Sequence, residues 1–172
     1  EVLPADTAAL APALQDAQRI VIWAGGGATA ASDAITELAA HWNAPVLTSF
    51  AGRGIAADSP LCVTAPIFEP ETNAMLAQAE ALVVLGSQLD GMNTKNWSLP
   101  WPATVVVVDA DPTFVLRNID PTAVLIANDL SAVADALHSD TKPRDEWFDV
   151  AALNTTVRDR LRVGEKSRRG FG

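Results

Sequence analysis

The chain has 172 residues, of which 49% are hydrophobic and 19% charged, and its formal net charge is −9. This composition predicts one folded domain of ordinary size rather than a disordered segment, and the acidic excess argues against nucleic acid as a partner. Cys62 is the only cysteine, so neither a disulfide nor a thiolate metal site is expected. No apolar run reaches membrane-spanning length and no signal-peptide pattern opens the chain, so we expect a cytoplasmic protein without membrane contacts.

Charge divides the chain near residue 141. Residues 1–141 hold four basic and sixteen acidic side chains, whereas eight of the twelve Lys and Arg residues follow Thr141. We therefore interpret residues 1–140 as the folded domain and residues 141–172 as a linker and helix toward a further, C-terminal domain. Because the sequence lacks an initiator Met and starts in a linker-like stretch, we expect it to be a segment of a longer protein.

Apolar periodicity predicts alternating helices and strands along the chain. The Ala- and Leu-rich residues 7–17 predict a first helix, which Asp6 or Thr7 can cap. A bulky apolar run at residues 19–24 predicts a strand that ends in three glycines, and residues 32–42 then predict a helix with one apolar face. Further strands are predicted at 45–49, 81–85, 104–108 and 122–127, with 61–66 as a candidate sixth, and further helices at 71–79, 114–117 (a short turn), 130–138 and 147–161.

This alternation predicts the fold class. Parallel strands need crossover connections, so strands that alternate with helices form a parallel sheet with helices on both faces. We expect an α/β domain with three layers and five to six parallel strands. In such a sheet the ligand crevice lies beyond the carboxyl ends of the strands, where the strand order reverses.

The three glycines after the first strand suggest a nucleotide site. Gly25, Gly27 and Ala30 fit the spacing G-x-G-x-x-A, and the following helix N-terminus would offer N–H groups to an anion. However, no acidic residue that could hold a ribose occurs near the end of the second strand before Asp58. The alternative is that the glycines only let the strand turn tightly into its helix.

Other catalytic patterns are missing from the sequence. It holds no P-loop, no serine nucleophile elbow and no zinc-ligand spacing, so we expect no catalytic residue and no metal ligand in this segment. His41 and His138 lie late in predicted helices, where the helix dipole favours a cation, and we interpret both as structural. Asp109 and Asp111 suit a turn and cap device, or ribose ligands, better than a metal pair.

Five sequence blocks, in this order, resemble the central domain of thiamine-diphosphate-dependent enzymes of the acetolactate synthase and benzoylformate decarboxylase group. The resemblance covers about residues 5–140 and implies a Rossmann-like domain. The blocks are Ile-Val-Ile-Trp-Ala-Gly-Gly-Gly, Ala-Pro-Val-Leu-Thr-Ser-Phe-Ala-Gly-Arg-Gly with Asp-Ser-Pro-Leu after it, Ala-Leu-Val-Val-Leu-Gly-Ser, Val-Val-Asp-Ala-Asp-Pro, and Asn-Asp-Leu-Ser-Ala-Val.

The resemblance implies a larger homo-oligomeric enzyme, a transferase or lyase that acts on 2-keto acids. Thiamine diphosphate and Mg²⁺ would then be bound by flanking domains outside this segment, which would not be catalytic alone. The central domain of some members binds FAD. The positions that match the FAD-contacting motifs are Gly25, Gly26, Gly27, Thr48, Ser49, Gly86, Asp109, Asp111 and Asp129.

Three departures from the flavin-binding pattern favour a structural domain over an FAD-binding one. Gln88 stands where flavin-binding members have an arginine, so a bidentate phosphate clamp is missing. Residues 65–68, Ala-Pro-Ile-Phe, replace a glycine-rich segment, and Phe114 replaces a glutamate. The alternative function is a free-standing domain that binds a nucleotide (FAD, NAD or ADP) or a protein partner.

Overall fold

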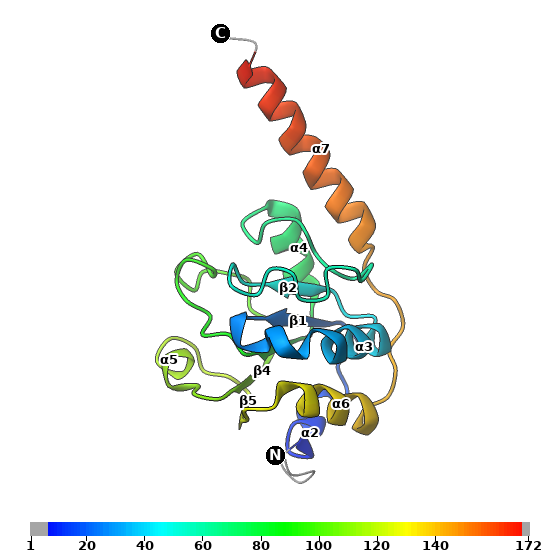
Figure 1. Ribbon diagram of the computed structural model, residues 1–172, viewed down its shortest axis with the longest axis vertical. Coiled ribbons are helices and arrows are strands. Elements are labelled where there is room, and N and C mark those ends of the chain that lie inside the picture. The colour runs from blue at the N-terminus through cyan, green and yellow to red at the C-terminus, as the bar shows by residue number, and fades with distance from the viewer. Residues whose placement is uncertain (1–6, 170–172) are drawn as a thin grey trace.

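The computed structural model describes residues 7–169, with side chains as far as residue 164. Within this part the strands form one parallel sheet in the order β2-β1-β3-β4-β5 (Figure 1). The predicted α/β fold class is therefore confirmed. The strands are β1 (Ile20–Ala24), β2 (Val46–Thr48), β3 (Ala81–Leu85), β4 (Thr104–Asp109) and β5 (Ala123–Ile126).

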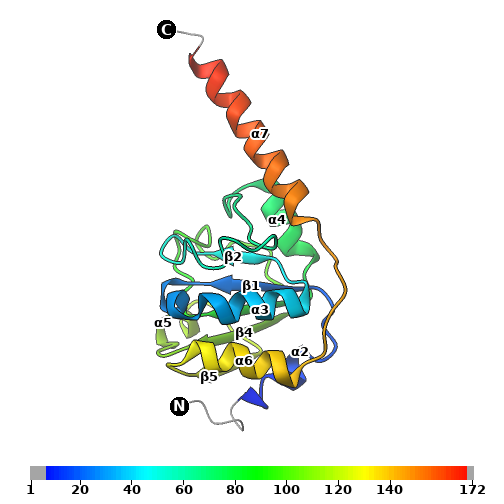
Figure 2. The same cartoon turned by 45° about the vertical axis from the view of Figure 1, so that its right-hand side comes forward.

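Helices cover both faces of the sheet, as Figures 1 and 2 show. Those on one face pack with Ile20 and Ile22, and those on the other face pack with Val21 and Trp23. Because both faces are covered, β1 and β3 are apolar at every position, as the sequence predicts for buried parallel strands. The first face carries α2 (Ala11–Leu14), α3 (Ser32–Trp42) and α6 (Leu130–Asp140), the second carries α4 (Pro70–Gln78), α5 (Thr113–Leu116) and α7 (Val150–Arg169), and a 3-10 helix, η1 (Gly26–Ala31), precedes α3.

The candidate sixth strand is reduced to a single bridge between Cys62 and Val46. Val46 N–H donates to the Leu61 carbonyl and Val63 N–H donates to the Val46 carbonyl, both at N···O distances of 2.9 Å. The bridge residue therefore lies at the sheet edge, beside β2. From β1 the chain first moves outward to β2 and the bridge, and it then crosses back to the other side of β1 to form β3, so the strand order reverses between β1 and β3. That reversal is the switch point at which ligands bind in open α/β sheets.

The first and the last helix differ most from their predicted bounds, whereas the others agree to within two residues. Of the helix predicted at 7–17, the described residues hold a helical Thr7, a turn at 8–10 and the short α2; Pro12, at the start of α2, has no N–H to donate to a continuous helix there. The last helix begins at Val150 rather than residue 147, because the Asp149 carboxylate accepts the Ala152 N–H at 2.8 Å and caps it there.

The same last helix, α7, continues to Arg169 and projects away from the sheet in Figures 1 and 2. Its first half is anchored by three buried side chains, those of Val150, Leu153 and Val157. None of the described helices is both long and apolar enough to cross a membrane.

Candidate ligand crevice at the switch point

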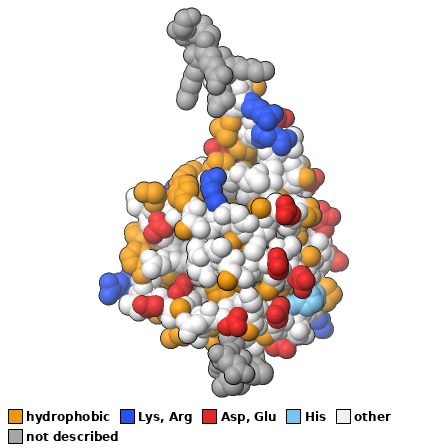
Figure 3. All heavy atoms as spheres, viewed as in Figure 1, with side chains coloured by type: hydrophobic (Ala, Val, Ile, Leu, Met, Phe, Trp, Pro, Cys, Tyr) orange, Lys and Arg blue, Asp and Glu red, His pale blue; other side chains and the backbone are white. Residues whose placement is uncertain are grey.

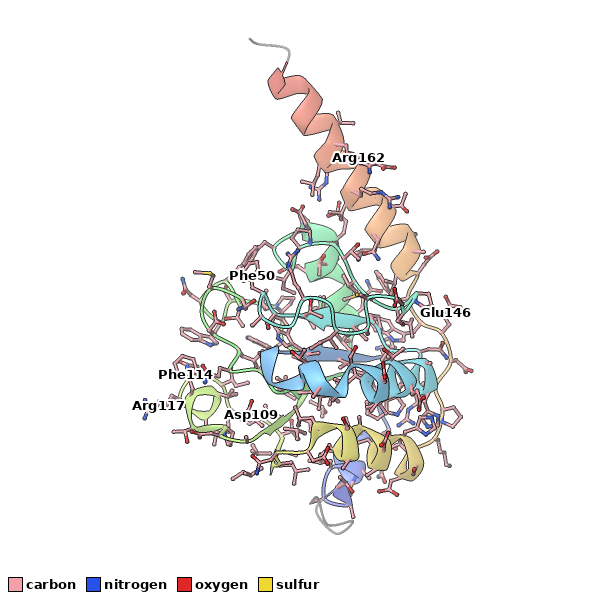
Figure 4. The ribbon with its side chains drawn as sticks, in the orientation of Figure 1. Phe50, Asp109, Phe114, Arg117, Glu146 and Arg162 are labelled. Carbon is pink, nitrogen blue, oxygen red and sulfur yellow. The ribbon has the colours of Figure 1, made fainter. Side chains whose placement is uncertain are left out.

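A polar crevice of about 330 Å³ opens at the carboxyl edge of the sheet, where β1 and β3 end. Its volume is at the lower end of the range for small-molecule sites. Figure 4 shows Asp109 at this edge, where β4 passes into the α5 segment that carries Phe114 and Arg117. The lining residues are Gly26, Gly27, Ser49, Ala51, Gly86, Ser87, Gln88, Asp90, Asn93 and Asp109.

The glycine loop after β1 packs against the turn after β3 with no room for side chains. A Cβ atom on Gly25 would lie 2.3 Å from the Gly86 carbonyl oxygen. Gly86 itself has a φ of +59°, and a Cβ there would lie 2.7 Å from the Ala28 nitrogen. Both positions therefore require glycine because two backbone segments meet, and no ligand is needed to explain them.

Three amides of this loop already have protein acceptors. Gly25 N–H donates to the Leu85 carbonyl at 2.9 Å, and Gly27 N–H and Ala28 N–H donate at 3.0 Å to the carbonyls of Gly86 and Gly25. Moreover, the residues that follow form the 3-10 helix η1, and α3 begins only at Ser32. The α-helix expected directly after the glycines thus begins only at Ser32, and the amides of Gly25 and Gly27 are engaged by the protein itself.

The three candidate aspartates each hold a local turn. Asp109 accepts the Asp111 N–H at 2.9 Å, and Asp111 accepts the N–H and the hydroxyl of Thr113. The Thr113 hydroxyl, followed by its N–H, lowers the pKa of Asp111 below the ordinary value. Asp129 caps α6 by accepting the Ala132 N–H at 2.9 Å, as the sequence predicts. These contacts agree with the turn and cap interpretation.

A second network in the crevice wall was not predicted from the sequence. The Asp90 carboxylate accepts the N–H groups of Met92 and Asn93 at 2.9 and 3.0 Å and the Asn93 side-chain amide at 2.6 Å. Burial acts to raise the pKa of Asp90, but the hydrogen bonds from Asn93 and Met92 together hold it below the ordinary value. The buried Asn93 also accepts the Phe50 N–H at 3.0 Å, so it ties together the loops after β2 and β3. The only sequence signal is the Asp-Gly pair at 90–91, which is typical of turns.

The predicted site residues are only partly brought together. Gly25 is buried behind the crevice, Thr48 lines a neighbouring hollow, and Asp111 and Asp129 are not among the crevice residues. The positions that do line the crevice are Gly26, Gly27, Ser49, Gly86 and Asp109.

The charge of the crevice does not suit a diphosphate. Asp90 and Asp109 line it, whereas no Lys or Arg does, and Gln88 occupies the position where the flavin-binding pattern has an arginine. A diphosphate binds best to arginines and unpaired amides, whereas no arginine lines the crevice and three amides of the glycine loop are already bonded to the protein. The described residues also contain no cluster of three or more His, Cys, Asp or Glu that could hold a metal ion. This domain therefore does not fit thiamine diphosphate with its Mg²⁺.

Comparison with known proteins places the chain in a family. The family described as thiamine pyrophosphate enzyme, central domain, matches residues 7–137. A curated relative, the probable 2-ketoarginine decarboxylase AruI of Pseudomonas aeruginosa, is 32% identical over 130 residues, which cover 75% of this chain and 23% of that protein. The chain thus spans about a quarter of the length of this relative. It belongs to the family of central domains of thiamine pyrophosphate enzymes.

Proposed function

We propose that the chain is the central, structural domain of a thiamine-diphosphate-dependent and Mg²⁺-dependent enzyme that acts on a 2-keto acid. Family membership supports the thiamine-dependent context, and the name of the relative AruI supports a decarboxylase with a 2-keto acid substrate. The domain itself supplies no catalytic residue. Flanking domains of the same chain would bind thiamine diphosphate and the metal ion, and several copies would assemble into the working enzyme.

The contacts of the glycine loop with the rest of the domain are the main support for a structural role. Three of its amides donate to backbone carbonyls, and its glycines make room for the turn after β3. Asp90 and Asp109 would also repel a diphosphate that entered the crevice. We therefore propose that the crevice holds no FAD, even though five of the nine positions that match the FAD-contacting motifs line it.

A binding titration tests this proposal directly. We expect calorimetry on the 172-residue chain to show FAD and ADP binding no tighter than about 0.1 mM, an affinity of roughly 5.5 kcal/mol. Gln88 is exposed at the crevice, so Gln88→Arg would restore one charge-assisted contact, worth about 1.5 to 3 kcal/mol, and would tighten ADP binding at least tenfold. Micromolar binding of FAD by the unaltered chain, or yellow protein as purified, would contradict the proposal.

The enzymatic context requires a second experiment on the complete gene product. We expect release of CO₂ from a 2-keto acid to require both thiamine diphosphate and Mg²⁺, and to stop when the metal is chelated. A natural protein that consists of this domain alone would instead support the free-standing binding or interaction domain.

A further inference from the structure

Away from the crevice, a hollow lies between α7 and residues 61–66 beside β2, which contain the Cys62 bridge and which we call the bridge segment. We call this hollow of about 430 Å³ the α7 groove. Residues of the bridge segment, Thr64, Ala65 and Pro66, line one side, and α7 forms the other side. The lining residues are Arg53, Thr64, Ala65, Pro66, Asn154, Val157, Arg158, Leu161 and Arg162.

The α7 groove is basic, whereas most of the molecule is acidic. Three arginines line it and no Asp or Glu does, although the chain as a whole has a net charge of −9. On the face seen in Figure 3, basic side chains gather at α7, and acidic side chains prevail lower on the body. Figure 4 shows Arg162 on the projecting part of α7.

The arginines of the groove are poorly neutralised by the described side chains. Arg53 and Arg162 form no ion pair with any side chain described. Arg158 pairs only with its neighbour Asp159, at an N···O distance of 3.7 Å between exposed groups, and donates to the Thr155 hydroxyl at 3.3 Å. Arg160, which faces away from the groove, is by contrast held by Glu69 and Glu71 at 2.5 and 2.7 Å.

Helix geometry places two of these arginines side by side. Arg158 and Arg162 are four residues apart, so they lie on the same face of α7, and like charges at this spacing destabilise a helix. Arg53 approaches the same hollow from the loop after β2. Three guanidinium groups with no described carboxylate between them form a site that a multiply charged anion can bind through charge-assisted hydrogen bonds.

The groove wall is rigid, which favours a built site over a chance cluster. The Asn154 side chain accepts the N–H groups of Thr64 and Ala65 at 2.9 and 3.3 Å and donates to the Cys62 carbonyl at 2.9 Å. These bonds fix α7 against the bridge segment. The groove also continues past Arg53, Thr64, Ala65 and Pro66 into a second hollow of about 220 Å³.

The second hollow would hold an apolar or planar part of the same ligand. Phe50 and Phe68 line it with ring centroids 6.5 Å apart. Arg53 lies over the Phe50 ring at 5.7 Å, and Lys95 lies over the Phe68 ring at 5.9 Å. Figure 4 shows Phe50 at the edge of the molecule that carries the loop after β2.

We propose that the α7 groove binds a small, multiply charged oxyanion through Arg53, Arg158 and Arg162. Phosphate esters and polycarboxylates share this chemistry, and both present oxygen atoms that arginine contacts in bidentate fashion. None of the three arginines lines the switch-point crevice, although the hollow beside the groove shares Asn93 with it.

The test is a titration of the isotope-labelled 172-residue chain with pyrophosphate and, separately, with citrate, followed by NMR. We expect saturable shifts at the amides of Thr64 and Ala65 and along α7 from residue 158 to 162. Arg53→Gln and Arg162→Gln, at two exposed positions, should each weaken binding at least tenfold, and raising the KCl concentration from 50 to 200 mM should weaken it severalfold. Arg117→Gln, an exposed arginine outside the groove, is the matched control and should change binding less than twofold.

Each outcome of the titration decides the proposal. Saturation by pyrophosphate alone supports a phosphate ester as the ligand, saturation by citrate alone supports a polycarboxylate, and saturation by both supports the shared chemistry. Shifts spread evenly over all basic residues, shifts at Gly26 and Gly27 instead of the groove, or no saturable shift would overturn it. If Arg53→Gln alters the fold, the exposed Arg162→Gln variant still decides the question.

Discussion

The crevice and the α7 groove lie on one molecule but have opposite chemistry. The crevice is at the place where this fold binds nucleotides, yet it is lined by two aspartates and no cation, and three amides of its glycine loop bond to the protein itself. The α7 groove lies at the edge of the sheet, where no general rule of the fold places a site, yet it carries three arginines with no acidic lining residue. The topology therefore positions a cleft, whereas individual side chains decide what the cleft can bind.

A substitution in the glycine loop should have the largest effect, and it tests whether backbone fills this side of the crevice. Gly25→Ala would force a Cβ within 2.3 Å of the Gly86 carbonyl oxygen, and neither backbone segment can move freely. We expect a loss of more than about 3 kcal/mol in the free energy of unfolding, measured by urea denaturation. Gly164→Ala on α7, where the new Cβ meets no described atom within 4 Å beyond its own stretch of helix, is the control and should stabilise the chain by about 0.5 kcal/mol. A Gly25→Ala variant as stable as the parent would show that the loop is not closely packed.

A substitution of Arg144 tests whether an arginine of this chain stabilises the fold without any part in ligand binding. It is only 6% exposed and donates to the carbonyls of Leu14 and Ala17 at 3.0 Å and to that of Lys142, with no acidic partner among the described residues. Arg144→Met would remove all three bonds and leave the Leu14 carbonyl with only the Ala17 N–H, so we expect a loss of about 3 kcal/mol by the same denaturation measurement. Arg162→Gln, which removes an exposed groove arginine, should change stability by less than about 0.5 kcal/mol. Equal losses would contradict the distinction between structural and binding arginines.

Asn154 tests the wall of the α7 groove. Asn154→Ala removes its three hydrogen bonds to the bridge segment, so we expect a loss of about 1 to 2 kcal/mol and faster hydrogen exchange at Thr64 and Ala65. Thr156→Ala, an exposed change two residues further along α7, should alter neither. Unchanged exchange at Thr64 in Asn154→Ala would mean that α7 is held by its apolar contacts alone.

A substitution of Asp90 should have the smallest effect, and it tests how the ionised carboxylate in the crevice wall contributes to stability. Because its pKa in the folded chain is lowered from the ordinary 3.8, its contribution to stability is present above that value and is lost as the pH falls through the lower, folded-state pKa. Asp90→Asn should cost about 1 kcal/mol at pH 7 and progressively less below pH 3.8, as thermal unfolding across pH 2 to 7 would show. The exposed Asp58→Asn is the control. A pH-independent difference would contradict a role for the ionised carboxylate.

Local patterns predicted the elements of this fold well. The apolar face at 32–42 coincides with α3, the run at 81–85 coincides with β3, and the cap at Asp129 is present. These features depend on residues close in sequence, for which periodicity and capping rules are sufficient. Pro12 shortened the first helix through the same local chemistry, although the Ala- and Leu-rich composition concealed this in the prediction.

The sequence by itself determined the parallel α/β fold, the family and the position of the crevice, because alternating apolar runs and glycine turns are encoded in adjacent residues. Tertiary structure alone decided how these parts are used. The close approach of Gly86 to Gly25 showed that backbone fills the glycine loop. The docking of α7 placed Arg158 and Arg162 in the same groove as Arg53, which precedes them by more than a hundred residues in the sequence. Such contacts depend on the packing of segments that are distant in sequence, and no local pattern contains that information.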